Sequence, residues 1–285
     1  MPPIAILTDF GTRDHYVGTM KGVMLGIAPE ATLVDISHEV APQDVLGGAL
    51  QLAASYRYFP RDTVFLAVID PGVGSARRAI AAEAGGFRFV APDNGLLTLV
   101  FNEAPPTRIV ELREPRYQRP EVSRTFEGRD RFAPAAAWLA TGVDLAALGP
   151  IVSEYLRLDV PEPAVESERV RGVVLAVDGF GNLVTNVPRA LVNRFGDATF
   201  TVGGTPVPRL VSTYAEMPPG EVCALIGSSN YLEFAVNSAS AAARLGLSRG
   251  TLVEVRPFDK AQGWALRQAQ GRPERSSRGE GRIHD

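Results

Sequence analysis

Residues 4–37 decide the fold, and they read IAILTDFGTRDHYVGTMKGVMLGIAPEATLVDIS. The run Ile4–Thr8 is short and apolar and ends at an aspartate, which predicts a buried strand that opens into a loop. Tyr16–Ala28 has apolar residues at helical spacing and stops before Pro29, which predicts a helix. Thr32–Ile36 predicts a second strand, so this stretch predicts a strand–helix–strand unit with parallel strands.

The same alternation continues through the first 160 residues. The runs Ala79–Ala84 and Phe87–Ala91 predict a hairpin, whereas residues 95–101 fit either a helix or an extended segment. The other predicted elements are a helix at 44–56, strands at 63–69 and 108–112, and a helix at 133–141. Strands that alternate with helices predict an N-terminal α/β domain, residues 1–160, with a largely parallel sheet.

The pattern changes after residue 160. Residues 161–169 are rich in proline and acidic side chains, which is typical of a linker. Over residues 170–258, short apolar runs separated by Gly and Pro turns predict a smaller β domain, either a sandwich or a barrel. Residues 259–285 are rich in Arg, Gly, Gln and Ser, which predicts a disordered tail.

The composition is that of an ordinary globular protein. The 285 residues carry a formal net charge of -3, so charge gives no reason to expect a nucleic-acid partner. No apolar stretch reaches the roughly 18 residues that a membrane span needs, and the opening residues predict a strand rather than a signal peptide. The single cysteine, Cys223, favours a cytoplasmic location. No metal is expected, because this cysteine and His15, His38 and His284 lack metal-site spacing.

Polar clusters follow several predicted strands, and open α/β sheets bind ligands at the carboxyl ends of their strands. Asp9 fits either an acceptor for ribose hydroxyls or a turn, and Asp14 is expected to cap the helix that begins at Tyr16. Between Asp70 and Arg78, a glycine-containing turn can bring the aspartate against an arginine that orients it and keeps it ionised. The alternative is a surface turn with an ion pair of little energetic value.

Three further clusters combine amides or carboxylates with glycine. Asn94 belongs to a turn that fits either a binding site or turn chemistry alone. Residues 125–130 are densely charged, and Asp130 is expected to cap the helix that follows. In residues 178–182, an aromatic ring, an amide and a carboxylate can bind a purine or form only a hairpin turn.

Taken together and in order, these motifs resemble the SAM hydroxide adenosyltransferase family, which is related to the SAM-dependent fluorinase and chlorinase. The opening motif is Leu7-Thr8-Asp9-Phe10-Gly11, followed by Asp14, Tyr16-Val17-Gly18 and Met20-Lys21-Gly22. The later motifs are Asp35-Ile36-Ser37-His38, Pro42-Gln43-Asp44-Val45, Asp70-Pro71-Gly72-Val73-Gly74, Ala91-Pro92-Asp93-Asn94-Gly95-Leu96, Gly128-Arg129-Asp130, Phe132-Ala133-Pro134, Phe180-Gly181-Asn182, Thr185-Asn186 and Glu233-Phe234-Ala235-Val236-Asn237. The resemblance extends to Phe258, and several motifs in a fixed order make it specific.

The resemblance implies an N-terminal α/β domain and a C-terminal β-barrel-like domain. It also implies a homotrimer with sites between the N-domain of one subunit and the C-domain of the next, and S-adenosylmethionine as the small-molecule partner. Asp9 is expected to bind the ribose hydroxyls. Adenine is expected at Phe180 and Asn182 and the methionine part at Ser228, Ser229 and Glu233, with Asn94 and Asp178 as further substrate contacts.

The loop at 70–78 separates the activities within the resembled family. Halogenases carry a tyrosine at the position of Asp70, whereas hydrolase-type members carry an aspartate, an arginine and a histidine around a water. This chain has Asp70 and Arg77, the latter chosen over Arg78 by its spacing, but Glu127 stands where the histidine is usual.

The resemblance therefore predicts hydrolysis of S-adenosyl-L-methionine by attack of water or hydroxide at the ribose C5′, without a cofactor. The expected catalytic residues are Asp70, Arg77 and Glu127. Glu127 either points into the site as a base or points away and pairs with Arg129 or Arg131. The alternative functions are a non-catalytic S-adenosylmethionine or adenosine sensor and a halogenase, which a carboxylate at position 70 disfavours because it repels halide.

Overall fold

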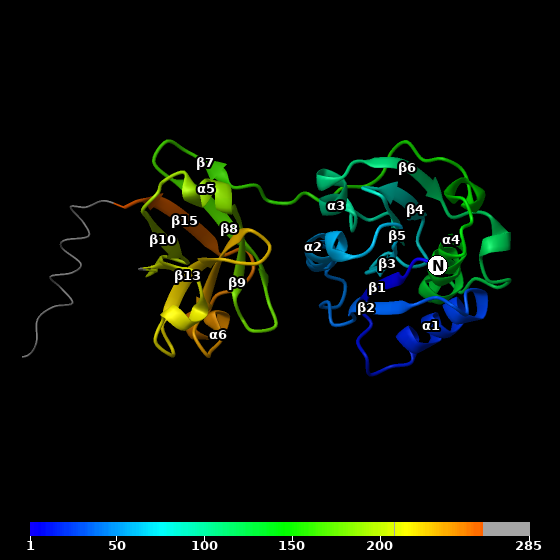
Figure 1. Cartoon of the computed structure of the whole chain (residues 1–285), viewed down its shortest axis with the longest axis horizontal. Helices are drawn as coiled ribbons and strands as arrows, with labels where there is room; N and C mark the ends of the chain where they lie inside the picture. Colours follow the sequence, from blue (N-terminus) through cyan, green and yellow to red (C-terminus); the bar gives the residue numbers. More distant parts are fainter. Residues whose placement is uncertain (208, 259–285) are drawn as a thin grey trace, which may run out of the picture. The chain divides into compact units, whose positions relative to one another are not determined.

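The computed structural model describes residues 1–207 and 209–258. The chain divides into two compact units, Met1–Val160 and Pro161–Asp285, and each is described by itself (Figure 1). The predicted disordered tail at 259–285 lies outside the described residues.

The first unit contains a six-stranded sheet in the order β2-β1-β3-β5-β4-β6. Its strands are β1 (Ile4–Thr8), β2 (Leu33–Ser37), β3 (Val64–Val68), β4 (Ala79–Ala84), β5 (Phe87–Pro92) and β6 (Pro106–Glu111). β2, β1, β3 and β5 run parallel, whereas β4 is antiparallel to both of its neighbours. The structure confirms the predicted α/β class with a parallel-rich sheet, and β4 and β5 form the predicted hairpin.

Helices cover both faces of this sheet (Figure 1). The helices are α1 (Tyr16–Ile27), α2 (Val45–Ser55), α3 (Thr98–Glu103) and α4 (Ala133–Ala140), with short 3-10 helices η1 (Tyr56–Tyr58), η2 (Pro115–Tyr117) and η4 (Leu145–Leu148) and a π-helix η3 (Gly128–Phe132). Ile4 and Ile6 of β1 belong to the core shared with α1 and α4. Ala5 and Leu7 belong to the core shared with α2 and α3. Side chains alternate along a strand, so residues 4–7 of β1 are all apolar because both faces of the strand are buried.

The second unit is built around a nine-stranded, mostly antiparallel sheet that curls into a half-barrel. Its main strands follow the order β11-β10-β15-β8-β9-β14-β13-β12, and β7 pairs with β8. The strands are β7 (Ala164–Val165), β8 (Val170–Val177), β9 (Leu183–Pro188), β10 (Ala198–Val202), β11 (Thr205–Val207), β12 (Leu210–Val211), β13 (Val222–Ile226), β14 (Tyr231–Val236) and β15 (Leu252–Pro257). The short helices are α5 (Arg189–Asn193), η5 (Tyr214–Glu216) and α6 (Ala241–Leu245). Phe200 and Phe234 are fully buried in its single large core.

Two predicted helix caps are wrong. The N-cap of α1 is His15 rather than Asp14. α4 continues directly from η3 with Phe132 as its N-cap, so Asp130 lies inside helical backbone rather than at a helix start. The Asp130 carboxylate instead accepts a hydrogen bond from the backbone N–H of Ser123 at 2.9 Å. An N-cap residue needs non-helical backbone, which Asp130 does not have.

Candidate active site

Three adjacent parallel strands of the first unit end at polar residues. Asp9 follows β1 directly, and Asp70 and Asn94 lie two residues beyond β3 and β5. Parallel strands share one carboxyl edge, so Asp9, Asp70 and Asn94 all lie at that edge of the sheet. The charge of Asp70 is close enough to Asp9 to affect its pKa.

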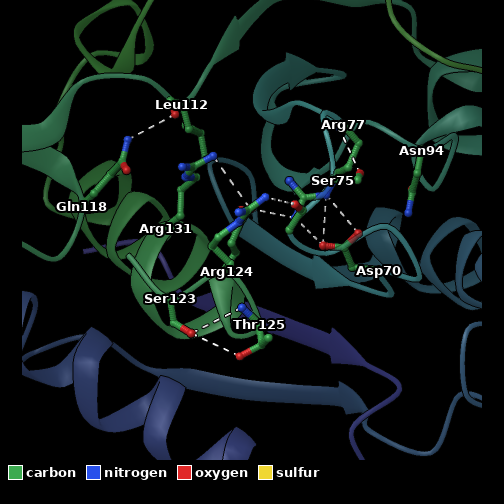
Figure 2. A network of polar contacts seen from close by, with 12 residues as sticks. Asp70, Ser75, Arg77, Asn94, Leu112, Gln118, Ser123, Arg124, Thr125 and Arg131 are labelled. Atoms are coloured by element: carbon green, nitrogen blue, oxygen red, sulfur yellow. Dashed lines mark hydrogen bonds and ion pairs between the residues drawn. The ribbon is translucent and has the colours of Figure 1, made fainter. Parts of the chain in front are cut away.

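The Arg77 guanidinium binds two carboxylates, and Figure 2 shows its contacts with the first of them, Asp70. Its Nε donates to both oxygens of Asp70, at 2.9 and 3.0 Å, and its Nη2 also donates to Asp70 Oδ2. The same Nη2 donates to Glu127 Oε2 at 2.7 Å, whereas Arg131 Nη1 lies 3.8 Å from that oxygen. The structure therefore brings Asp70, Arg77 and Glu127 into one cluster, and Glu127 points into it rather than away.

This cluster is buried. The side chains of Asp70, Arg77 and Glu127 are only 5%, 8% and 9% exposed, and Arg77 Cζ lies 5.1 Å from the ring centroid of Phe132. Burial alone lowers the pKa of Arg77, but the hydrogen bonds and charges of both carboxylates together raise it, so the guanidinium stays charged. Arg131 also contributes a guanidinium 3.8 Å from Glu127, so two arginines face the two carboxylates.

Two segments meet to form the cluster, the loop at 70–78 and the segment that leads into η3. Gly74 has φ +75°, and a Cβ at this position would lie 2.4 Å from the carbonyl oxygen of Arg124. Arg124 Nη2 also donates to the carbonyl oxygen of Gly74 at 3.2 Å. Glu127 is the N-cap of η3, and π-helical turns are frequent at functional sites. A glycine at position 74 thus allows the close packing that puts Arg77 against Glu127.

Arg78 has a different partner. Its Nε and Nη2 donate to Asp93 Oδ2 at 2.9 and 2.6 Å, and its Nη2 also donates to the carbonyl oxygen of Glu154 at 2.7 Å. Asp93 Oδ1 accepts from the backbone N–H of Leu156 at 2.8 Å. The arginine that binds Asp70 is therefore Arg77. Arg78 instead links Asp93, which follows β5, to the backbone at Glu154.

Asp9 and Asn94 differ in how much of their side chain is available to a ligand. Asp9 Oδ2 accepts from the backbone N–H of Gln43 at 2.7 Å. Burial raises the pKa of Asp9, and the charge of Asp70 adds to the rise while backbone hydrogen bonds oppose it. Asn94 Nδ2 donates to the carbonyl oxygen of Ile69 at 2.8 Å, and its Oδ1 accepts from Leu96 N–H at 3.2 Å. Asn94 thus stabilises the turn, and its contact with substrate stays a prediction.

In the second unit, Asp178 organises the turn between β8 and β9. Its Oδ1 accepts from the backbone N–H groups of Phe180 and Asn182 at 2.9 and 2.8 Å, and its Oδ2 accepts from Asn182 Nδ2 at 2.9 Å. The predicted hairpin turn is therefore present, and it leaves the Phe180 ring 83% exposed. An exposed ring on a fixed turn is available for stacking.

A hollow of about 520 Å³ adjoins this turn and is lined by Phe180, Asn182, Tyr214, Val236, Ser238, Ala239 and Ser240. A Cβ on Gly181 would lie 2.0 Å from Ser240 Oγ, so the turn packs directly on the serine segment. The sequence analysis missed Tyr214, which no motif marks, and the segment 238–240. That segment directly follows the motif ending at Asn237, a position that could have indicated it.

The carboxylate of Glu233 on β14 is buried. The residue is 7% exposed, and a Cβ on Gly227 would lie 1.7 Å from Glu233 Oε1, so the carboxylate packs against this glycine. Burial raises the pKa of Glu233, and the negative charge of Asp178 raises it further. Ser228 and Ser229 are exposed in the adjoining turn between β13 and β14. Glu233 thus packs against Gly227, the residue that immediately precedes the two serines.

Two kinds of feature are absent from residues 1–207 and 209–258. None of their helices combines the length and apolar character needed to cross a membrane. None of their His, Cys, Asp and Glu side chains form a group of three or more that could hold a metal ion.

Comparison with known proteins matches both units. The models of the SAM hydroxide adenosyltransferase N-terminal and C-terminal domains match residues 4–149 and 172–254. A Thermus thermophilus protein named (R)-S-adenosyl-L-methionine hydrolase is 42% identical over 90% of this chain and 100% of its own length. A fluorinase from Actinoplanes is 33% identical over 89% of this chain and 97% of its own. The crystal structure of an uncharacterized conserved protein from Thermotoga maritima has a TM-score of 0.83 at 38% identity, covering 89% of this chain and 99% of that one.

Proposed function

The chain belongs to the SAM hydroxide adenosyltransferase family, and on this basis we propose that it hydrolyses S-adenosyl-L-methionine to adenosine and L-methionine. The observation that carries the proposal is the buried contact of Arg77 with Asp70 and Glu127 at the carboxyl edge of the parallel strands. Relatives named (R)-S-adenosyl-L-methionine hydrolase at up to 42% identity support it.

The reaction sets two requirements for the site. The oxygen of a water attacks the ribose C5′, the bond from C5′ to sulfur breaks, and its electron pair stays on sulfur as a neutral thioether. The leaving group therefore needs no acid, but the attacking water must lose one proton. Holding that water in line at about 3–3.5 Å from the carbon contributes much of the acceleration, and a base contributes the rest.

The two carboxylates divide these tasks. Arg77 binds both oxygens of Asp70, so Asp70 is rigid and orients the water. Glu127 is bound through Oε2 alone, and no hydrogen bond from the described residues reaches its Oε1, which takes the proton. A carboxylate at position 70 repels halide, which favours hydrolysis over halogenation.

The substrate-binding residues belong to both units. Asp9 binds the ribose hydroxyls, and the ring of Phe180 and the amide of Asn182 bind adenine. Ser228, Ser229 and Glu233 bind the methionine part, whose ammonium suits a buried carboxylate. We infer a homotrimer in the cytoplasm, with each site formed by the first unit of one subunit and the second unit of the next, and no cofactor.

Incubation of the purified protein with S-adenosyl-L-methionine, followed by chromatography, tests the proposal, with Asp70→Ala as the control. Release of adenosine and methionine by the unaltered protein and not by the variant is the expected result. The resembled family usually has histidine at the position of Glu127. This difference favours a second candidate function, a non-catalytic sensor that binds S-adenosyl-L-methionine or adenosine. Tight binding without products would establish that alternative and end the hydrolase proposal.

A further inference from the structure

Behind Asp9, four side chains form a continuous line of polar contacts from the surface to the end of β1. Lys21 Nζ lies 2.6 Å from Asp35 Oδ2. Asp35 Oδ1 lies 2.9 Å from His38 Nε2. His38 Nδ1 lies 2.8 Å from Thr8 Oγ1. The line therefore joins α1, β2 and β1 and ends at the residue that immediately precedes Asp9.

The inner half of this line is buried and the outer half is not. Thr8 is 0% exposed and His38 is 5% exposed, whereas the side chains of Lys21 and Asp35 are 30% and 43% exposed. Burial raises the pKa of Asp35, but the hydrogen bonds and charges of Lys21 and His38 outweigh it, so the pKa is lowered and the carboxylate stays ionised.

Thr8 Oγ1 lies within hydrogen-bonding distance of two groups. Thr8 Oγ1 accepts from the backbone N–H of Phe10 at 3.3 Å, so its own hydroxyl hydrogen is free to donate to His38 Nδ1. His38 Nε2 lies 2.9 Å from Asp35 Oδ1, but the angle between them is not that of a hydrogen bond, so the contact is one of proximity.

Residues 38–43, which follow β2, form hydrogen bonds with Asp9 and with residues on either side of it. Gly11 N–H donates to the carbonyl oxygen of His38 at 2.7 Å. Gln43 N–H donates to Asp9 Oδ2 at 2.7 Å, and Gln43 adopts φ +66°, which is unusual for a residue other than glycine. His38 thus contacts the loop through its ring before Asp9 and through its carbonyl after it.

We propose that Thr8, His38, Asp35 and Lys21 are positioning residues that set the orientation of the Asp9 carboxylate for the two ribose hydroxyls. The inference rests on the proposed function, because it assumes that Asp9 binds ribose. A threonine beside a histidine and an aspartate also resembles a nucleophilic triad, but Thr8 is completely buried and no substrate can reach its hydroxyl. A positioning role uses the same contacts without that access.

The test compares binding of adenosine and 2′,3′-dideoxyadenosine to the full-length chain by calorimetry. Thr8→Val keeps the shape of the side chain and removes only the hydroxyl, so it should weaken adenosine binding about tenfold, equivalent to about 1.4 kcal/mol. Dideoxyadenosine lacks the hydroxyls that Asp9 recognises, so its affinity should not change. Thr8→Ser restores the hydroxyl and should restore the preference for adenosine.

A double variant separates positioning from general destabilisation. In an Asp9→Ala background the carboxylate is gone, so Thr8→Val should then have no further effect on adenosine binding. Should Thr8→Val fail to fold, Lys21→Met alters the line from its exposed end and should reduce the same preference by a smaller factor.

Equal weakening of both ligands by Thr8→Val, or no weakening of either, would overturn the inference. It is also overturned if the unaltered chain binds the two nucleosides equally. Hydrolysis is measured separately: a chain that prefers adenosine but never cleaves S-adenosyl-L-methionine would disprove the proposed reaction and leave the positioning role intact.

Discussion

At the scale of single residues, the two carboxylates on Arg77 are not equivalent. Both oxygens of Asp70 accept from the guanidinium, whereas only one oxygen of Glu127 does. A carboxylate held at both oxygens is a good template for orienting water but a poor acceptor for its proton. Glu127 keeps one oxygen for that purpose, so a glutamate in the position where the resembled family usually has histidine is compatible with base catalysis.

Replacement of Glu127 by glutamine should therefore remove the base and retain the shape. The amide oxygen can still accept from Arg77, so we expect folding and substrate affinity to be maintained. We expect kcat for S-adenosyl-L-methionine to fall about 10²–10⁴-fold, the usual contribution of a general base. Steady-state kinetics measures this change. The matched control is Glu30→Gln, which alters an exposed glutamate of the same unit. An unchanged kcat would exclude Glu127 as the base.

At neutral pH the buried carboxylate of Glu233 should lower the free energy of unfolding. Its pKa is raised in the folded state, by burial first and by Asp178 second, so the folded chain binds a proton more tightly than the unfolded chain does. Ionised Glu233 is therefore unfavourable above its raised pKa, and this cost disappears as the pH falls below the unfolded value of about 4.3. We expect Glu233→Gln to increase the free energy of unfolding at pH 7 and to have little effect near pH 4. Urea denaturation at both pH values measures this, and a loss of stability at pH 7 would contradict it.

At the scale of elements, the site depends on how closely the loop at 70–78 packs on the segment before η3. A Cβ on Gly74 would meet the carbonyl oxygen of Arg124, and neither backbone can move without displacing Arg77 or Glu127. We expect Gly74→Ala to lower the free energy of unfolding by about 1–3 kcal/mol and to reduce kcat more than tenfold, since small displacements are costly in catalysis.

Gly142→Ala is the matched control for this substitution. Gly142 also has a positive φ, +95°, but a Cβ there has nothing within 4 Å. It should show only the cost of the left-handed backbone, about 1–2 kcal/mol, with full activity. If both variants kept full activity, the packing of the 70–78 loop would not be needed to align the cluster.

The elements themselves follow from the sequence because their local pattern and their burial agree. β3 and residues 4–7 of β1 are apolar since both faces of their sheet are covered, and polar residues follow because the strands end at an open edge. The spacing within the 70–78 loop was sufficient to select Arg77 over Arg78 as the partner of Asp70.

The contacts that the sequence could not predict join elements distant along the chain. The support of the Asp9 loop by His38 and Gln43 exists only because β1 and β2 pair in parallel, which places their two following loops side by side. Tyr214 reaches the hollow beside Phe180 from a short helical turn, whose capping box of Thr213 and Glu216 indicates a helix start but not a binding residue. The caps expected at Asp14 and Asp130 failed for a similar reason, because the course of the backbone before each helix is set by tertiary packing.

At the scale of the whole molecule, the proposed site requires groups from two separately folded units. The cluster of Asp70, Arg77 and Glu127 belongs to the first, and Phe180 with its hollow belongs to the second. The first unit provides the carboxylate cluster for the proposed reaction, and the second provides the exposed Phe180 ring for adenine. In the proposed homotrimer, each active site takes one unit from each of two neighbouring subunits.

Mixing two defective chains tests this arrangement directly. Glu127→Gln disables the first unit and Phe180→Ala disables the second, and the Phe180 ring is exposed, so its removal should not disturb folding. If sites form between subunits, random co-assembly of the two variants combines an intact first unit with an intact second unit in about a quarter of the sites. Co-expressed chains, purified as trimers and assayed below the KM, should then regain about that fraction of wild-type activity, while each variant alone stays nearly inactive. Sites contained within single subunits predict no recovery at any mixing ratio, because every chain carries one of the two defects.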